Sequence, residues 1–276
     1  MLPRKIFNLP LPTLQALTFD DQGQQVSDIV KELIHNSIDA RATKIEITIE
    51  SGGYSLIKVA DDGCGIIKES LPDACRYYST SKISSRSDLA KLETFGFRGS
   101  SLAHFSCISK VLISSKTRHE DNASCCNYVY NVPIGSDKCI MDNQNGTIVE
   151  LKDLLYNCPE AKRNRKTDPI EAHNVVKLVL KYAILFPEIS FIIYSNPSFT
   201  PKFFSKLLDT TMPNNIETVL SLLTIQGDSK LPFLRNVSEK FGDYKIDFYL
   251  SNYSLHFLNS VRGIYINKRL ISCRPI

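Results

Sequence analysis

Residues 31–40 read Lys-Glu-Leu-Ile-His-Asn-Ser-Ile-Asp-Ala and are the most informative stretch of the chain. On an α-helix, Glu32, Asn36 and Asp39 stand at positions i, i+4 and i+7, so a carboxylate, an amide and a second carboxylate share one stripe. Apolar side chains take the other side of the helix. Such a helix is most often an ordinary surface helix. The segments that follow decide whether it is more than that.

A β-hairpin is predicted directly after this helix. Residues 45–50 alternate apolar and polar side chains, a Ser-Gly-Gly turn follows, and residues 55–60 form a second strand. The second strand leads into Asp61, with Gly63 and Gly65 behind it. A carboxylate in this position can accept a hydrogen bond from an exocyclic amine, while the glycines let the backbone pass close to a flat ring. Taken alone, Asp-Asp-Gly is more often a turn.

Four motifs in a fixed order add specificity. They are Glu32-x-x-x-Asn36-x-x-Asp39-Ala40, Asp61-x-Gly63-x-Gly65-Ile66, Thr94-Phe95-Gly96-Phe97-Arg98-Gly99 and Asn145-Gly146-Thr147. Their order and spacing resemble the nucleotide-binding motifs of the GHKL superfamily of ATPases. Thr80-Ser81-Lys82, the Gly96–Gly99 segment and residues 153–163 further resemble the N-terminal region of MutL-type mismatch-repair proteins. This resemblance spans residues 14–276.

The resemblance implies an α+β fold in two parts. Residues 1–204 are expected to form the GHKL (Bergerat) ATPase sandwich of mixed sheet and helices. Residues 205–276 are expected to begin a truncated transducer domain of the ribosomal-S5-like type. The sequence patterns agree, with antiparallel strands between residues 111 and 151 and an amphipathic helix over residues 171–185.

Shorter elements are predicted from local patterns. Residues 71–78 look helical, and a strand is expected over residues 189–194. In the second part, a helix is expected near residues 216–223, with strands near residues 245–250 and 263–266. Residues 79–93 are rich in Ser and Lys and show little periodicity, which is typical of a loop.

The resemblance also implies roles for individual residues toward ATP and Mg²⁺. Glu32 is expected to be the general base that orients or deprotonates the attacking water, and Asn36 to be the magnesium ligand. Asp61 is expected to read the purine amine, with Thr147 supporting it. The remaining residues expected to bind the nucleotide are Asp39, Ala40, Gly63, Gly65, Ile66, Thr80, Ser81, Lys82, Thr94, Gly96, Phe97, Arg98 and Gly99.

The phosphate contacts have a physical basis of their own. Backbone N–H groups of a glycine-containing turn before a helix make an anion site, so Gly96–Gly99 is expected to cradle the phosphates. Lys82 and Arg98 are expected to face the same phosphates and to fold down as a lid. The ordinary alternative is a Ser- and Lys-rich surface loop.

Two departures from the family pattern point to a branch of the family. Ser100 stands where MutL proteins usually carry a glutamate, and residues 17–23 replace the usual Ile-Ala-Ala-Gly-Glu-Val run. Together with Tyr77-Tyr78, these features resemble the eukaryotic branch of the PMS-one type and the fungal MutL homologue two. That branch implies a nuclear protein, a heterodimer with a paralogue of the MutL-homologue-one type, and contact with mismatch-recognition complexes of the MutS type.

The end of the sequence also departs from the family. A lysine-bearing strand that reaches the γ-phosphate in MutL proteins has no counterpart before Ile276. The sequence therefore suggests a cut inside the second domain, and hydrolysis by this fragment is expected to be slow or absent.

Composition agrees with a globular protein inside the cell. The 276 residues are 43% hydrophobic and carry a net charge of +4, and no apolar run reaches membrane-spanning length. The N-terminus lacks the apolar block of a signal peptide, so no membrane partner is expected. Eight cysteines without a Cys-x-x-Cys pair are expected to be reduced thiols.

One basic run suggests a nucleic-acid partner. Residues 162–166 contain Lys162, Arg163, Arg165 and Lys166, which are expected to contact duplex DNA phosphates without reading bases. A run of this kind is more often a solvated loop.

Three functions remain open from the sequence. The first is a slow ATPase whose ATP-bound state closes a dimer on DNA in mismatch repair. The second is a nucleotide-dependent module that binds DNA or protein with little turnover, in mismatch repair or recombination control. The third is another GHKL protein, such as a topoisomerase subunit or a kinase, against which Thr80-Ser81-Lys82 argues.

Overall fold

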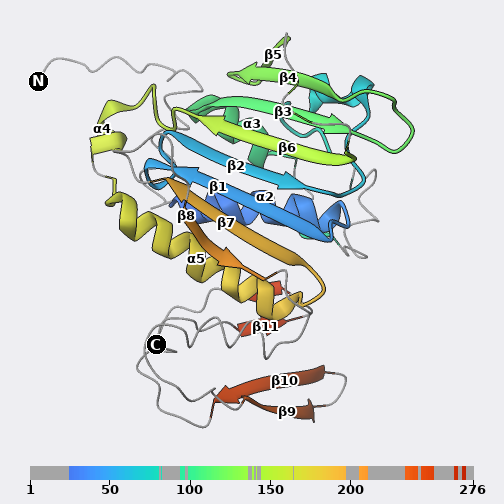
Figure 1. The fold of residues 1–276 in the computed structure, drawn as a ribbon, viewed down its shortest axis with the longest axis vertical. Helices are drawn as coiled ribbons and strands as arrows, with labels where there is room; N and C mark the ends of the chain where they lie inside the picture. Colours follow the sequence, from blue (N-terminus) through green and yellow to red (C-terminus); the bar gives the residue numbers. More distant parts are fainter. Residues whose placement is uncertain are drawn as a thin grey trace, which may run out of the picture.

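The computed structural model describes most of the first 210 residues and four strands beyond them (Figure 1). The described residues are 25–80, 82, 94–96, 99–135, 139, 141, 144–163, 165–196, 205–210, 234–241, 244–251, 264–266 and 269–271. In this part of the chain, no helix is both long enough and apolar enough to cross a bilayer.

An eight-stranded mixed sheet forms the centre of the molecule. Its strand order is β5-β4-β3-β6-β2-β1-β7-β8, and only the pairing of β1 with β7 is parallel. The strands are β1 (Lys44–Glu50), β2 (Leu56–Asp61), β3 (Lys110–Lys116), β4 (Ser124–Val129), β5 (Val132–Gly135), β6 (Gly146–Lys152), β7 (Ser190–Asn196) and β8 (Ser205–Asp209).

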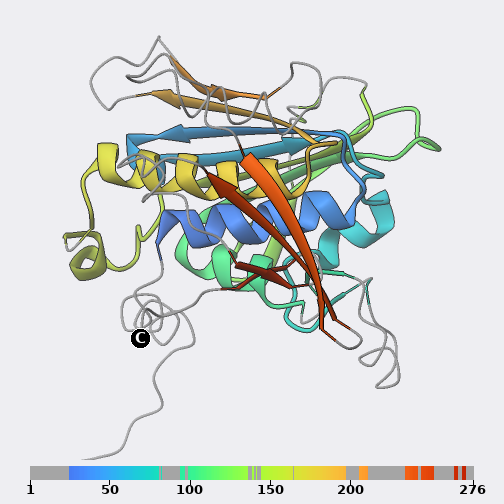
Figure 2. The same cartoon turned by 90° about the horizontal axis from the view of Figure 1, so that it is seen from below.

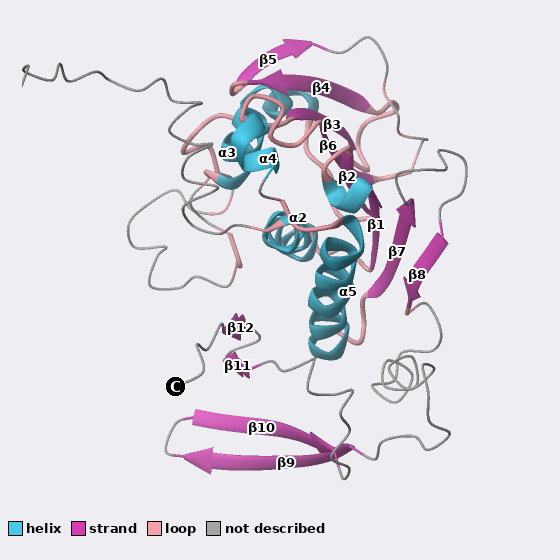
Figure 3. Cartoon of the chain, turned by 90° about the vertical axis from the view of Figure 1, so that its left-hand side faces the viewer, coloured by secondary structure: helices cyan, strands magenta, loops and turns pink. Residues whose placement is uncertain are grey.

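The helices cover one face of this sheet, which gives two layers (Figures 2 and 3). The long helices α2 and α5 lie side by side against the strands, and α3 lies next to α2. The helical elements are α2 (Val26–Asp39), η1 (Ser51–Gly53), η2 (Lys68–Asp73), α3 (Ser101–Ile108), α4 (Pro159–Arg163) and α5 (Asp168–Leu185), where η1 and η2 are 3₁₀-helices.

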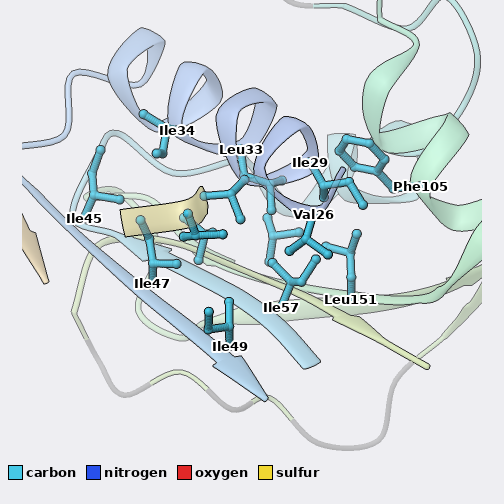
Figure 4. Packing of buried hydrophobic residues seen from close by; sticks show 14 of the residues in the cluster. Val26, Ile29, Leu33, Ile34, Ile45, Ile47, Ile49, Ile57, Phe105 and Leu151 are labelled. Atoms are coloured by element: carbon cyan, nitrogen blue, oxygen red, sulfur yellow. The ribbon is translucent and has the colours of Figure 1, made fainter. Parts of the chain in front are cut away.

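Helix α2 is fixed to the sheet by its apolar stripe. Its fully buried side chains recur at i, i+3, i+4, i+7 and i+8, as expected for a helix with one core-facing side. They are Val26, Ile29, Val30, Leu33 and Ile34. In Figure 4 the labelled side chains of α2 lie on the side of the helix that faces the alternating isoleucines of β1 and Ile57 of β2. Burying each of these side chains stabilises the fold by about 1.5–3 kcal/mol, so the polar stripe of α2 has one orientation.

Both long helices have ends that the sequence explains. The backbone N–H of Gln25 donates to Asp28 Oδ2 at 2.9 Å, which satisfies a group at the start of α2. Helix α5 begins at Asp168 with Pro169 in its first turn, where a missing N–H costs nothing, and it ends before the Phe186-Pro187 pair.

Most predicted elements are confirmed. The hairpin is β1 and β2, the strands between residues 111 and 151 are antiparallel, and the amphipathic helix begins three residues earlier than expected. The predicted strand over residues 189–194 is β7. The seven described cysteines are free, as expected.

The prediction for residues 71–78 is wrong in its extent. The helical part is the 3₁₀-helix η2, which ends at Asp73, and residues 74–78 form turns and a bend. Tyr78 has φ +64°, in the left-handed region, so a right-handed helix cannot extend to the end of this segment.

Beyond residue 210 the structure describes two small antiparallel pairs. Strand β9 (Leu234–Phe241) pairs with β10 (Tyr244–Ser251), and β11 (Ile264–Ile266) pairs with β12 (Arg269–Ile271). The predicted strands near residues 245–250 and 263–266 are therefore present, while the predicted helix near residues 216–223 lies outside the described residues. The division into residues 1–204 and 205–276 stays a prediction, and β8 pairs with β7 in the main sheet.

Candidate functional site

The carboxylate of Asp61 lies where β2 meets the polar stripe of α2. Ser37 Oγ donates to Asp61 Oδ2 at 2.8 Å, and the backbone N–H of Gly63 donates to Oδ1 at 3.0 Å. Burial raises the pKa of the Asp61 carboxyl above its ordinary value, and the bonds from Ser37 and Gly63 act in the opposite direction. A half-buried carboxylate with acceptor capacity at a strand end can receive a further N–H from a bound molecule.

Asp62, the next residue, has different hydrogen-bond partners and a different role. Its carboxylate accepts from the backbone N–H groups of Thr43 and Lys44 at 2.7 and 2.8 Å and from the Thr43 hydroxyl at 2.5 Å. Although its partial burial acts to raise the pKa of Asp62, these hydrogen bonds hold it below its ordinary value. Asp62 therefore fixes the connection between α2 and β1, and of the two carboxylates Asp61 is the one turned toward the site.

Two glycines allow the backbone to pass close to Asp61. Gly146 has φ +130°, and a Cβ there would overlap the backbone carbonyl oxygen of Asp61. A Cβ on Gly63 would lie 2.7 Å from the Ala40 side chain, and the Cys64 N–H donates to the Ala40 carbonyl at 3.0 Å. The chain around Asp61 is therefore packed backbone against backbone.

Thr147 is placed beside Asp61 by strand register. The two residues are partners across β2 and β6, and Thr147 is buried. Its hydroxyl lies 2.9 Å from Ser115 Oγ, which also accepts the Ile66 N–H at 2.7 Å. Thr147, Ser115 and Ile66 thus form one hydrogen-bonded group at this end of the site.

The other end of the polar stripe of α2 holds a lysine. Lys82 Nζ donates to Asp39 Oδ2 at 2.6 Å and to Asn36 Oδ1 at 2.9 Å. Asp39 also accepts the backbone N–H groups of Phe95 and Gly96, at 2.9 and 3.2 Å. The side chain of Asp39 is only 5% exposed, so its charge is balanced inside the protein by one ammonium and two amides.

Glu32 stands one turn before Asn36 and faces helix α3. Ser101 Oγ, on the first residue of α3, donates to Glu32 Oε2 at 2.9 Å. His35 Nδ1 lies 3.9 Å from Glu32 Oε1, and His35 Nε2 lies 2.6 Å from the Tyr182 hydroxyl. The His35 ring stacks on Phe95 with centroids 4.7 Å apart, which ties α2 to the segment before Gly96.

Four further glycine and threonine positions shape the same region. Gly65 has φ +76° and packs on the Lys116 backbone, while Gly99 has φ +58° and packs on the Ser79 backbone. Thr94 Oγ1 donates to the Gly96 carbonyl at 3.0 Å. Thr80 Oγ1 accepts the Lys82 N–H at 3.1 Å, so it shapes the loop that presents the lysine.

The structure brings together most of the predicted nucleotide residues. Ser81, Phe97 and Arg98 lie outside the described residues. The others gather around the polar stripe of α2 and are Glu32, Asn36, Asp39, Ala40, Asp61, Gly63, Gly65, Ile66, Thr80, Lys82, Thr94, Gly96, Gly99 and Thr147.

The predicted DNA residues lie apart from this group, in and after α4. Lys162, Arg163 and Lys166 are exposed. Arg165 is also exposed, but its guanidinium stacks over the Tyr54 ring at 4.8 Å and pairs with Asp168 at 3.6 Å. Arg165 therefore has packing partners of its own, unlike a residue of a solvated loop.

Four residues that contact the predicted site residues were missed from the sequence: Ser37, Ser101, Ser115 and His35. Ser115 carries a sequence signal, because it continues the apolar strand Val111–Ile113 and is fully buried there. Ser37 also had one, since it lies within the helix motif directly after Asn36. Ser101 and His35 had none, because their contacts join separate elements.

The donor set at the lysine end fits a hard cation. Asn36 Oδ1 and Asp39 Oδ2 are oxygen ligands that already accept one positive charge, from Lys82. Within the described ranges, no group of three or more His, Cys, Asp or Glu side chains could hold a metal by itself. Any such ion would need further ligands from a bound molecule or from water.

Known proteins share this arrangement. Residues 24–150 match a family described as histidine kinase-, DNA gyrase B- and HSP90-like ATPases. The solved structures with this fold include the MutL ATPase domain of Aquifex aeolicus complexed with ADP, with a TM-score of 0.62, 23% identity and coverage of 90% of this chain and 83% of that one. They also include the N-terminal domain of a DNA repair protein, with a TM-score of 0.73, 26% identity and coverage of 94% and 78%.

Sequence relatives narrow the assignment. The DNA mismatch repair protein MutL of Carboxydothermus hydrogenoformans is 37% identical over 69% of this chain and 32% of its own length. That of Dictyoglomus turgidum is 33% identical over 97% of this chain and 45% of its own length. The chain thus spans less than half the length of these relatives. It belongs to the MutL family and is an N-terminal ATPase region of the GHKL type.

Proposed function

We propose that this chain binds Mg²⁺-ATP between α2 and the ends of β2 and β6, and that it serves as the slow ATPase of a mismatch-repair protein. The observation that carries the proposal is Asp61, a half-buried carboxylate held by Ser37 and Gly63 and in register with Thr147. The ADP complex of the Aquifex aeolicus domain supports a nucleotide as the ligand.

One end of the site suits a purine. We name Asp61, Ser37, Gly63 and Thr147 the purine end. Asp61 would accept the exocyclic amine of adenine, and the Thr147 group would support it directly or through water. A guanine presents a carbonyl at the equivalent position, which a carboxylate would repel, so the purine end favours adenine.

The other end suits phosphates. We name Asn36, Asp39, Lys82 and the Thr94–Gly96 segment the phosphate end. When ATP binds, Lys82 Nζ would move away from Asn36 and Asp39 and would contact phosphate oxygens instead. Asn36 Oδ1 would hold Mg²⁺, which supplies neutralisation of phosphate charge when bound.

Glu32 is the residue that we assign to the attacking water. Its side chain is 38% exposed, so a water molecule can reach it, and it lies one helical turn from Asn36. In the proposed reaction Glu32 accepts or orients the proton of that water, while Lys82 and the Gly96 N–H face the phosphates.

The whole protein would act on DNA and as a dimer. We propose that ATP binding folds Lys82 and the Gly96–Gly99 segment down as a lid. Two MutL-family proteins then associate on duplex DNA, with MutS-type complexes as further partners. The mismatch-repair relatives support this setting. Placement in the eukaryotic PMS-one and fungal MutL-homologue-two branch, with a nuclear location and a heterodimer partner of the MutL-homologue-one type, rests on Ser100, Tyr77 and Tyr78.

Two substitutions on α2 test the assignment of roles. Glu32→Ala should keep ATP binding and lose about 10²-fold or more in single-turnover hydrolysis by the full-length protein. Asn36→Ala should instead lower ATP affinity only when Mg²⁺ is present, which titrations with and without the ion will measure. Normal hydrolysis by Glu32→Ala would refute the general base, and magnesium-dependent affinity equal to that of the wild type in Asn36→Ala would refute the ligand.

The DNA contact is tested at the exposed residues of the basic run. Lys162→Ala/Arg163→Ala should flatten the slope of log K against log salt by about 2, since each lost phosphate contact removes about 0.9. The matched control is Lys68→Ala/Arg76→Ala, which removes the same charge from exposed positions elsewhere. Fluorescence anisotropy with a matched and a mismatched duplex should give equal changes. Equal slopes for both double variants would mean that the run does not contact DNA.

One alternative stays open within the same site. A module that binds ATP as a switch and hardly hydrolyses it would use the same purine and phosphate ends. Ser100, in place of the glutamate that MutL proteins usually carry, favours this version. Single-turnover hydrolysis distinguishes the switch from the ATPase. A switch should bind ATP tightly and hydrolyse it so slowly that Glu32→Ala lowers the rate no further.

A further inference from the structure

Among the described residues, Glu32 accepts a hydrogen bond through one of its two carboxylate oxygens only. Its Oε2 accepts the Ser101 hydroxyl at 2.9 Å, whereas Oε1 accepts no hydrogen bond from the residues that the structure describes. His35 Nδ1 lies 3.9 Å from Oε1, which is beyond hydrogen-bond distance. The two oxygens of this carboxylate are therefore unequal.

Ser101 reaches Glu32 from a different element. It is the first residue of α3, which starts directly after Gly99 and Ser100, and its partner lies 69 residues earlier in the chain. Helix α3 is itself anchored, because Phe105, Cys107 and Ile108 are buried against the sheet. The Ser101 hydroxyl is thus presented from a fixed position.

His35 is likewise fixed in place. Its Nε2 lies 2.6 Å from the hydroxyl of Tyr182, a residue of α5 that is 1% exposed. Its ring stacks on Phe95 at an interplanar angle of 21°. The His35 ring, about one helical turn after Glu32 on α2, therefore has a fixed position beside Glu32 Oε1.

We propose that Ser101 is a positioning residue for hydrolysis, and that its hydroxyl fixes the Glu32 carboxylate so that Oε1 alone receives the proton of the attacking water. The proposal deepens the function proposed above and rests on Glu32 as the general base. It assigns a role to a residue for which the sequence carried no signal.

The physical reason is the freedom of a half-exposed glutamate. A Glu side chain loses rotamer entropy when it is fixed. A hydrogen bond that fixes it before ATP arrives removes part of that cost from the reaction itself. A bond of this type contributes about 0.5–1.5 kcal/mol, which corresponds to about 2- to 12-fold in rate.

Substitution of Ser101 tests the proposal by turnover and by affinity. Ser101→Ala should lower single-turnover hydrolysis by the full-length protein about 3- to 10-fold and leave the dissociation constant for ATP unchanged. Ser101→Thr keeps a hydroxyl and should restore the rate. Ser70→Ala, at an exposed position of η2, is the matched control and should hydrolyse ATP at the rate of the wild type.

A double substitution separates positioning from general structural support. Combined with Glu32→Ala, Ser101→Ala should lower the residual rate no further, because the residue that it positions is gone.

A second measurement does not depend on turnover. Isotope-edited infrared spectroscopy, with Glu32→Gln to identify the band, should show the Glu32 carboxylate stretch shifted in Ser101→Ala and restored in Ser101→Thr.

The outcomes distinguish this proposal from the function on which it rests. An unchanged or faster rate in Ser101→Ala, together with inactive Glu32→Ala, overturns the positioning and leaves the general base intact. Equal losses from Ser101→Ala in the wild-type and Glu32→Ala backgrounds, or an unshifted carboxylate band, also overturn it. Normal hydrolysis by Glu32→Ala, or no hydrolysis by the wild type, refutes the proposed base and the positioning with it.

Discussion

The purine end and the phosphate end of the site are built in different ways. At the purine end, Asp61 and Thr147 are register partners in the sheet, and the Gly146 backbone lies directly against Asp61. At the phosphate end, Asn36 and Asp39 are held by the side chain of Lys82 and by two loop amides. Backbone pairing fixes the first end, and exchangeable polar contacts fix the second.

This difference matches what each end has to do. A base reader must keep its geometry whether or not ATP is bound, and strand register provides this. A phosphate site must balance its own charges when empty and release them when the ligand arrives. Lys82 does the balancing here, since it lies at 2.6 Å from a carboxylate that is 5% exposed. We therefore expect substitutions at the purine end to destabilise the protein mainly by straining the backbone. Substitutions at the phosphate end should destabilise it mainly by leaving a buried charge unbalanced.

The largest effect is expected from a single methyl group at the purine end. Gly146→Ala should lower the free energy of unfolding by at least about 3 kcal/mol, because φ is +130° and the added Cβ would overlap the Asp61 carbonyl oxygen. Gly135→Ala is the control, since Gly135 has φ +73° and no atom within 4 Å of the added Cβ. It should cost about 1 kcal/mol. Equal costs in denaturant titrations would mean that the close approach is not there.

A smaller effect is expected from charge at the phosphate end. Lys82→Ala should lower the free energy of unfolding by about 1–3 kcal/mol, because it leaves the buried Asp39 without its ammonium. Lys110→Ala breaks a pair of similar length, 2.7 Å to Asp153, with side chains 57% and 51% exposed. That variant should change stability by less than about 0.5 kcal/mol. Equal changes in the two variants would contradict a charge-balanced phosphate end.

The smallest effect is a pH dependence at the purine end. Since the folded state has the higher pKa for Asp61, the folded protein binds the proton more tightly than the unfolded chain. The contribution of Asp61 to stability is therefore greatest below its unfolded pKa, and it falls as pH rises through the folded pKa. Compared with Asp61→Asn, the wild type should lose stability over that window, measured by thermal unfolding in a pH series. A gain of stability with rising pH would contradict the burial of this carboxylate.

The purine end could largely be predicted from the sequence. The apolar alternation of β1 and β2 fixes the hairpin, and a strand that ends at Asp61 must place it beside α2. The stripe of α2 followed from helical spacing in the same way. These features depend on short-range periodicity, which is visible in the order of the residues.

The contacts of the phosphate end and of Glu32 could not be predicted in this way. Ser101 meets Glu32, His35 meets Tyr182, and Lys82 meets Asp39 across separations of 43 to 147 residues. Such contacts depend on how complete elements pack, and no periodicity records them. For the same reason the packing of Arg165 on Tyr54 was not foreseen, although the basic run was evident.

The central claim is that Asp61, and not its neighbour, reads the adenine. Calorimetric titration with Mg²⁺-ATP should show affinity about tenfold or more weaker for Asp61→Asn, because an amide in this position leaves a buried polar group unpaired at a cost of about 1–3 kcal/mol. Asp62→Asn, which changes the carboxylate that holds Thr43 and Lys44, should bind ATP within about twofold of the wild type. Equal affinity of Asp61→Asn and the wild type would contradict the account.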